Sequence, residues 1–215
     1  SSMAWALNHA LKYNKSRIVF AIPYTSIITQ TAQIYRSIFS EDNVVEHHSN
    51  IDESLNTQEQ KLAVENWDAP VIVTTNVQLF ESLYSNKTSR CRKLHNLVNS
   101  IIILDEAQML PPEFLRPILS VLNGLVNNFG VSLMFSTATQ PALTGKIGVN
   151  GQNAFEGIPG NVVREVIKEV GTLSEDLKRV QIILPERMNE TFDWPVIADE
   201  LKEHEQVLCI VNTRS

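Results

Sequence analysis

Two adjacent carboxylates, Asp105 and Glu106, are the strongest candidates for chemistry in this 215-residue sequence. They follow the aliphatic run 101–104, which is typical of a strand buried on both faces of a parallel sheet. Open α/β sheets bind ligands at the carboxyl ends of their strands, so the pair suits a nucleotide site. One carboxylate can hold Mg²⁺ through water, and the other can orient or deprotonate an attacking water. The alternative is that Asp105 only caps the next helix.

Hydroxyl-rich turns follow three other candidate strands. These turns are Tyr24-Thr25-Ser26 after residues 17–22, Thr74-Thr75 after 70–73, and Ser136-Thr137-Ala138-Thr139 after 131–135. In a parallel sheet they would all lie at the edge that carries Asp105 and Glu106. Hydroxyls and backbone amides at such an edge suit the phosphate oxygens of a nucleotide or a nucleic acid. A single threonine is more often a helix N-cap, but three turns beside an acidic pair favour a binding site.

Apolar residues at helical spacing separate these strands. They predict helices over 1–11, 27–38, 58–67, 77–84 and 115–129. The rest of the chain predicts a strand at 180–184, a helix at 194–204 and a strand at 207–211. Alternating strands and helices predict an α/β fold, with a mostly parallel sheet, flanking helices and right-handed crossovers.

Three segments carry no clear site. Residues 40–57 are polar and acidic and predict a surface loop, because no Asp or Cys completes a metal-ligand set with His47-His48. The basic run 87–93 predicts a solvated loop, with phosphate contact as the alternative. Residues 144–160 contain many of the glycines and predict a loop or small hairpin.

The composition is that of a globular protein, 43% hydrophobic and 20% charged. A net charge of −6 argues against nucleic-acid binding by bulk charge, although a local groove is compatible with it. No apolar run approaches the roughly 20 residues that span a bilayer, so no membrane partner is expected. Cys91 and Cys209 lie far apart and predict free thiols in a reducing compartment, the cytoplasm.

Four phrases resemble helicase motifs Ia, Ib/Ic, II and III of superfamily 2, the DEAD/DEAH-box-like helicases. They are PYTSIITQTA at 23–32, VTTNVQLFESL at 73–83, IIILDEAQMLPPEFLRPI at 101–118 and FSTATQPAL at 135–143. The wording DEAQ, LPPEFL and STATQPAL resembles the CRISPR-associated helicase-nuclease of type I systems, and the resemblance covers roughly residues 1–143.

The resemblance implies a RecA-like ATPase core that moves along single-stranded DNA and uses ATP and Mg²⁺. By motif position, Asp105 would hold the Mg²⁺ of ATP, and Glu106 would position or activate the hydrolytic water. Gln108 would link hydrolysis to movement together with Ser136, Thr137 and Thr139. The residues implied along the DNA strand are Pro23, Tyr24, Thr25, Gln30, Thr74, Thr75 and Gln78.

The resemblance also implies two domains and a larger assembly. Residues 1–172 would be a first RecA-like domain and 173–215 the start of a second, since VLCIVNTRS resembles its first strand. The first glycine is Gly124, so we expect an interior fragment of a larger enzyme that lacks the strand of the phosphate-binding loop (P-loop) and is inactive alone. The implied partners are single-stranded DNA and an RNA-guided CRISPR surveillance complex.

Two alternatives stay open at this point. The first is a different superfamily 2 helicase that acts on RNA or on repair substrates. The second is a non-catalytic nucleic-acid-binding or assembly module with a decayed ATPase.

Overall fold

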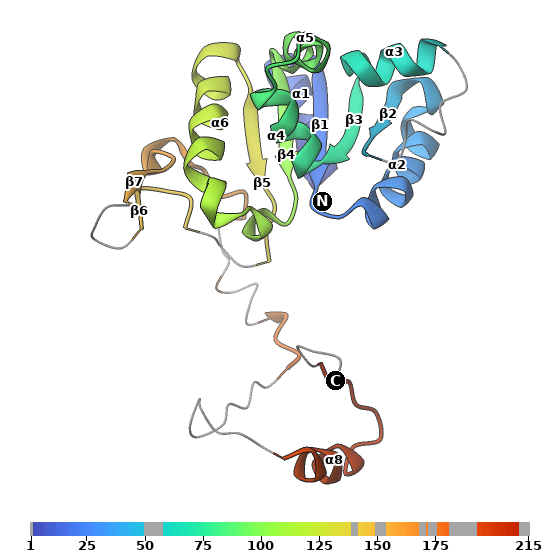
Figure 1. Ribbon diagram of the computed structural model, residues 1–215, viewed down its shortest axis with the longest axis vertical. Coiled ribbons are helices and arrows are strands. Elements are labelled where there is room, and N and C mark those ends of the chain that lie inside the picture. The colour runs from blue at the N-terminus through green and yellow to red at the C-terminus, as the bar shows by residue number, and fades with distance from the viewer. Residues whose placement is uncertain are drawn as a thin grey trace. The chain divides into compact units, whose positions relative to one another are not determined.

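The computed structural model describes residues 2–49, 58–138, 142–148, 154–167, 171, 176–180 and 193–210 (Figure 1). The internal contacts divide the chain into two units, Ser1–Arg164 and Glu165–Ser215. The domain boundary expected after residue 172 stays a prediction.

The first unit is built on a five-stranded sheet in the order β2-β3-β1-β4-β5. All neighbouring strands in it are parallel, which confirms the predicted α/β fold. The strands are β1 (Arg17–Ile22), β2 (Val44–His47), β3 (Val71–Thr75), β4 (Ser100–Leu104) and β5 (Ser132–Phe135).

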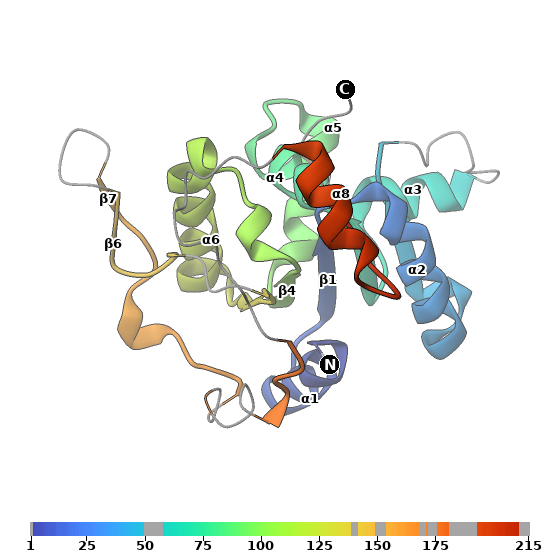
Figure 2. The same cartoon turned by 90° about the horizontal axis from the view of Figure 1, so that it is seen from below.

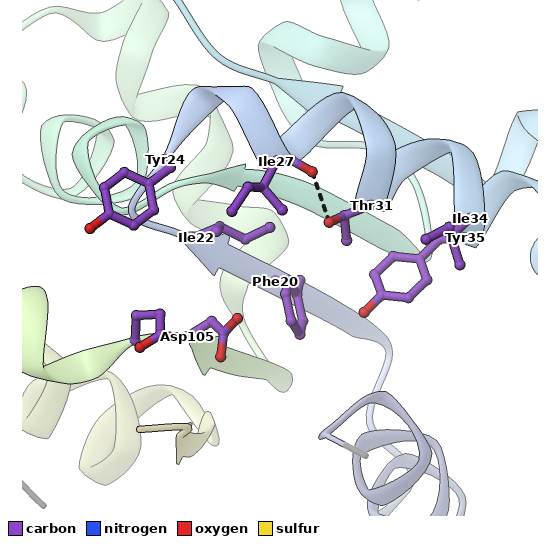
Figure 3. Close-up of a pocket in the computed structure, with 9 residues that line it drawn as sticks. Phe20, Ile22, Tyr24, Ile27, Thr31, Ile34, Tyr35 and Asp105 are labelled. Atoms are coloured by element: carbon purple, nitrogen blue, oxygen red, sulfur yellow. Dashed lines mark hydrogen bonds between the residues drawn. The ribbon is translucent and has the colours of Figure 1, made fainter. Parts of the chain in front are cut away.

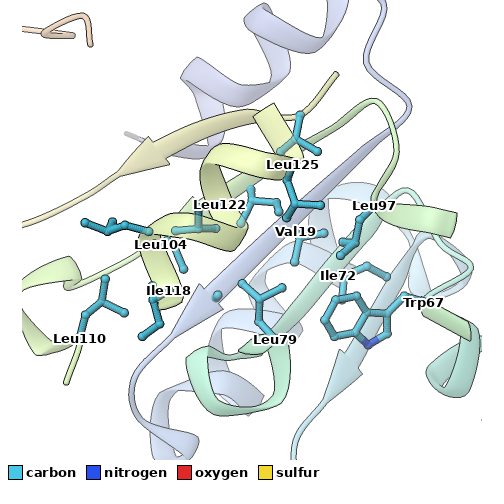
Figure 4. Close-up of a cluster of buried hydrophobic side chains, with 14 of the residues drawn as sticks. Val19, Trp67, Ile72, Leu79, Leu97, Leu104, Leu110, Ile118, Leu122 and Leu125 are labelled. Atoms are coloured by element: carbon cyan, nitrogen blue, oxygen red, sulfur yellow. The ribbon is translucent and has the colours of Figure 1, made fainter. Parts of the chain in front are cut away.

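Helices cover both faces of this sheet because successive side chains of each buried strand point to opposite faces. Ile101 and Ile103 pack with α1 (Ser2–Tyr13) and α2 (Thr25–Phe39). Ile102 and Leu104 pack into the other cluster, which is shown in Figure 4. Its helices are α3 (Gln58–Asn66), α4 (Asn76–Tyr84) and α6 (Leu115–Phe129). Figure 2 separates α1 and α4 on opposite sides of β1.

Helix α6 follows the predicted apolar stripe and buries Ile118, Leu119, Leu122 and Leu125. Pro117 lies in its first turn, where a missing backbone N–H costs no helical hydrogen bond. Gly130 ends the helix with φ 63°, in the left-handed region that glycine adopts without steric cost. The predicted helix is therefore confirmed with its end at Phe129.

Short elements complete the first unit. They are α5 (Thr88–Cys91), the 3₁₀ helices Glu41–Asn43, Arg92–Leu97, Ala107–Met109, Pro112–Phe114 and Gly160–Val162, and the hairpin of β6 (Lys146–Ile147) and β7 (Phe155–Glu156). The hairpin fits the prediction for residues 144–160. The prediction of a solvated loop for the basic run 87–93 is wrong in part, because Lys93 is buried. Its ammonium lies 5.9 Å from the centre of the Trp67 ring.

In the second unit, α8 (Trp194–Lys202) forms at the predicted helix. Residues 207–210 form no strand, so the strand expected at 207–211 is not observed there. The strand expected at 180–184 lies almost entirely outside the described residues. None of the described helices is both long enough and apolar enough to cross a membrane.

Candidate nucleotide and nucleic-acid site

The carboxyl edge of the parallel sheet gathers the predicted residues. Asp105 and Glu106 follow β4, and Ser136 follows β5. Thr25 opens the helix after β1, and Thr75 ends β3. Because all five strands run in one direction, these residues lie at one edge, as predicted from their positions after strands.

Backbone hydrogen bonds extend the sheet past the ends of its strands and fix the acidic turn. The Asp105 N–H donates to the Ala21 carbonyl at 2.9 Å. The Ser136 N–H donates to the Leu104 carbonyl at 2.9 Å, and the Ala107 N–H donates back to the Ser136 carbonyl at 3.0 Å. The turn after β4 is therefore attached to both neighbouring strands.

Glu106 adopts a left-handed backbone conformation, with φ 49° and ψ 48°. This region is uncommon for residues other than glycine, and strained residues of this kind cluster at functional sites. The conformation reverses the chain directly after Asp105. It places the two carboxylates on an abrupt turn and not on a continuing strand or helix.

The Gln108 side chain connects this turn to the turn after β5. Its Nε2 donates a hydrogen bond to Oε2 of Glu106, and its Oε1 accepts the Thr137 hydroxyl at 2.6 Å. Glu106, Gln108 and Thr137 are all half-buried. A continuous hydrogen-bonded connection thus joins one carboxylate to the segment 136–137, which is 30 residues further along the chain.

A cavity of about 340 Å³ lies beside the acidic pair (Figure 3). Asp105 faces it from one side, and side chains of β1 and α2 form the apolar wall. Its lining residues are Phe20, Ile22, Tyr24, Ile27, Thr31, Ile34, Tyr35, Asp105 and Glu106. Among the described residues of this lining, the two carboxylates are the charged groups. Burial, and in second place the charge of Asp105, raise the pKa of Tyr35 to about 12.

The start of α2 and the residues just before it present predicted nucleic-acid residues at the surface. Tyr24, Thr25 and Gln30 are exposed, and Pro23 is half-buried. The Tyr24 side chain makes no capping hydrogen bond. The first backbone N–H groups of a helix have no partner within the helix and suit phosphate oxygens. This end of α2 is therefore accessible and chemically suited to a phosphate backbone.

The threonines at the end of β3, unlike the residues at the start of α2, have hydrogen-bond partners within the protein. Thr74 is fully buried, and its hydroxyl donates to the His47 carbonyl at 2.8 Å. Thr75 caps α4, its Oγ1 accepting the Gln78 N–H at 2.9 Å. The side-chain contact expected between Thr74 and DNA does not fit this burial. For Thr75 the capping alternative is the one observed, and Gln78 remains half-buried near the edge.

The prediction of a surface loop around His47-His48 is wrong, because residues 44–47 form the buried edge strand β2. The Nδ1 atom of His47 accepts a hydrogen bond from Nε1 of Trp67 at 3.0 Å, and Trp67 is fully buried. Glu46, also buried, faces α2. The only sequence signal for this strand was the aliphatic pair Val44-Val45, which is too short to distinguish a strand from a loop.

Comparison with known proteins identifies the family. The family model described as DEAD/DEAH box helicase matches residues 2–145. The chain belongs to the DEAD/DEAH box helicase family. It is also similar to the CRISPR-associated nuclease/helicase Cas3 of Haloferax volcanii, with 32% identity over 146 residues. That match covers 59% of this chain, which spans about 16% of the length of the relative.

DEAD/DEAH box helicases in general use ATP with Mg²⁺. In this helicase chain the described residues contain no group of three or more His, Cys, Asp or Glu side chains that could hold a metal alone. Mg²⁺ typically binds through one or two carboxylates, phosphate oxygens and water, so Asp105 at the edge of this cavity fits an ion that arrives with ATP. Of the predicted coupling residues, Thr139 lies outside the described part of the chain.

Proposed function

We propose that this helicase chain belongs to an ATP-dependent translocase that moves along single-stranded DNA in type I CRISPR interference. ATP hydrolysis would drive DNA unwinding and feed the strand to a nuclease, in the cytoplasm and together with an RNA-guided surveillance complex. The similarity to a CRISPR-associated nuclease/helicase supports this choice over other superfamily 2 helicases.

The connection from Glu106 through Gln108 to Thr137 carries the proposal. In this scheme ATP supplies the phosphoryl group to be transferred and Asp105 holds its Mg²⁺. Glu106 accepts a proton from the attacking water or orients that water. Because Gln108 bonds both Glu106 and Thr137, a change at the carboxylate is transmitted to the turn after β5.

The DNA strand is proposed to follow the carboxyl edge from α2 to α4. Pro23, Tyr24, Thr25 and Gln30 contribute from the start of α2, and Gln78 contributes from α4. A translocase must accept any sequence, and phosphate contacts carry no direct sequence information. The exposed first turn of α2 supplies neutral N–H and hydroxyl donors for such contacts, so the net charge of −6 is no obstacle.

The test is ATP turnover by the complete polypeptide that contains this chain, with single-stranded DNA or RNA of several sequences. We expect DNA of any sequence to stimulate turnover. The variant Glu106→Gln should bind ATP normally but turn it over about 10²–10⁴-fold more slowly. Glu113→Gln, which changes an exposed acid nearby, is the matched control and should behave as wild type.

Each alternative function has its own outcome in this assay. Stimulation by RNA alone would favour an RNA helicase. Normal turnover by Glu106→Gln would show that Glu106 does not activate the water. Nucleic-acid binding without any turnover in the wild type would favour the non-catalytic module.

A further inference from the structure

Glu46 is a buried carboxylate on the edge strand β2, with only 4% of its surface exposed. Three side chains surround it. Its Oε1 accepts the Thr29 hydroxyl at 2.8 Å and contacts Nε2 of His48 at 3.1 Å, while its Oε2 accepts from Nη1 of Arg36 at 3.0 Å. A buried carboxylate is costly unless it is paired and hydrogen-bonded, and here both oxygens have partners.

Two of these partners lie on one stripe of α2. Thr29 and Arg36 are seven residues apart, which is about two helical turns. The Glu46 carboxylate therefore contacts side chains from two turns of α2. Contacts at two points restrict both the rotation of α2 and its sliding along the sheet. Apolar packing also holds α2 on the sheet, because Ile28 and Ala32 are fully buried and Tyr35 and Phe39 pack against the same cluster.

The next residue of β2 points to the opposite face and connects to β3. The His47 side chain accepts from Trp67, and its carbonyl accepts the Thr74 hydroxyl. In the strand register, His47 lies opposite Thr74. The end of β2 is thus attached to α2 on one side, through Glu46, and to the end of β3, which leads into Gln78, on the other.

We propose that Glu46 is a positioning residue for nucleic-acid binding. It sets where the first turn of α2, with Tyr24 and Thr25, lies relative to the start of α4. This inference rests on the function proposed above, because it assumes that these two segments contact one DNA strand. Glu46 itself is buried and touches no DNA.

The test compares two variants that each remove one negative charge beside Arg36. Glu46→Gln removes the buried partner of Arg36, whereas Glu41→Gln removes an exposed partner whose carboxylate lies 3.2 Å from Nε of the same arginine. Affinity for single-stranded DNA and for ATP is measured on the complete polypeptide. We expect Glu46→Gln to weaken DNA binding roughly tenfold, since small displacements of positioned groups are costly. Glu41→Gln should bind DNA as the wild type does.

Two readouts separate positioning from a general loss of structure. With Glu46→Gln, the DNA concentration for half-maximal stimulation of ATP turnover should rise, while turnover at saturating DNA and ATP affinity stay unchanged. Thr29→Val removes one hydrogen bond and keeps the ion pair, so it should fold and weaken DNA binding in the same direction by a smaller factor. Thr29→Val therefore still tests the proposal if the Glu46→Gln variant does not fold.

The failures are distinguishable. If the wild type does not bind single-stranded DNA, the proposed function itself is wrong. If the wild type binds DNA and both Glu46→Gln and Thr29→Val match Glu41→Gln, the positioning role of Glu46 is overturned and the proposed function stands. A parallel loss of ATP affinity and DNA affinity in both variants would also overturn the positioning role of Glu46.

Discussion

At the scale of single residues, the Gln108 amide joins the acidic turn to the turn after β5, beside the backbone hydrogen bond from Ala107 to Ser136. It uses both of its functional ends, donating to Glu106 and accepting from Thr137. Neither bond is available to a residue with an apolar side chain at this position. Gln108 is therefore the side chain that links the chemistry proposed for Glu106 to the movement proposed for the segment after β5.

Replacing Thr137 by valine should separate hydrolysis from movement. The variant keeps the shape of the side chain but loses the hydroxyl that Gln108 accepts, while Glu106 keeps its own bond to Gln108. We expect the complete polypeptide to retain most of its DNA-stimulated ATP turnover and to unwind fewer base pairs per ATP. Thr144→Val, at an exposed threonine, is the control. Equal losses of turnover and unwinding would contradict this role for Thr137.

The Tyr35 hydroxyl should titrate late. Its pKa is raised from 10.0 to about 12, first by burial and then by the charge of Asp105. Because the folded state holds this proton more tightly than the unfolded state, the associated stability is present below pH 10. It is lost as the pH rises from about 10 to about 12.

Near-ultraviolet absorbance of tyrosinate is the measurement. Tyr35→Phe should remove one late-titrating group of the four tyrosines and flatten the fall in stability over that pH range. Ionisation of all tyrosines near pH 10 in the folded wild type would contradict the raised pKa of the half-buried Tyr35.

At the scale of elements, the start of α4 shows how a capping role and a binding role can be told apart. Thr75 is buried to 5% exposure and caps the helix, while Gln78 lies one turn further on and is half-buried. The cap fixes the direction in which α4 leaves the sheet edge.

Thr75→Ala should cost about 0.5–2 kcal/mol of stability, the usual effect of losing an N-cap. Thr75→Ser retains an acceptor oxygen but loses a buried methyl group, so it should cost less stability than Thr75→Ala. Urea unfolding of the two variants is the measurement. If alanine costs no stability but weakens DNA binding strongly, then Thr75 acts mainly by contacting the ligand.

At the scale of the whole molecule, the described site provides carboxylates, hydroxyls and an amide, and no basic side chain is found among the described residues that line the cavity beside Asp105. Phosphoryl transfer depends on several cationic and hydrogen-bonding parts that act at once. Family members use ATP, and the chain spans about 16% of the length of its curated relative. The remaining parts of the reaction are thus expected from other segments.

The 215-residue polypeptide alone should therefore not hydrolyse ATP measurably. Phosphate release with Mg²⁺, ATP and single-stranded DNA is the assay, and the complete polypeptide at equal concentration is the positive control. DNA-stimulated turnover by residues 1–215 that disappears in Glu106→Gln would contradict this expectation. It would show that this chain holds the phosphate with its own residues.

The sequence alone determined the layered α/β architecture and the edge on which the site lies. Aliphatic runs such as 101–104 can only be buried between two layers, and the residues after them must then lie at one edge of a parallel sheet. That reasoning is local and needs no knowledge of distant contacts. It placed Asp105, Glu106 and Ser136 correctly.

Only the tertiary structure decided which polar residues at that edge are accessible. Thr25 and Thr74 both follow strands in the sequence, yet Thr25 is exposed and Thr74 is covered by β2. Strand β2 itself has too few aliphatic residues to be recognised, because its stability comes from Trp67 and α2, which are distant in the chain. The bond between Gln108 and Thr137 likewise depends on the pairing of β4 with β5. Burial and partners are properties of the packed sheet, and no short stretch of sequence contains them.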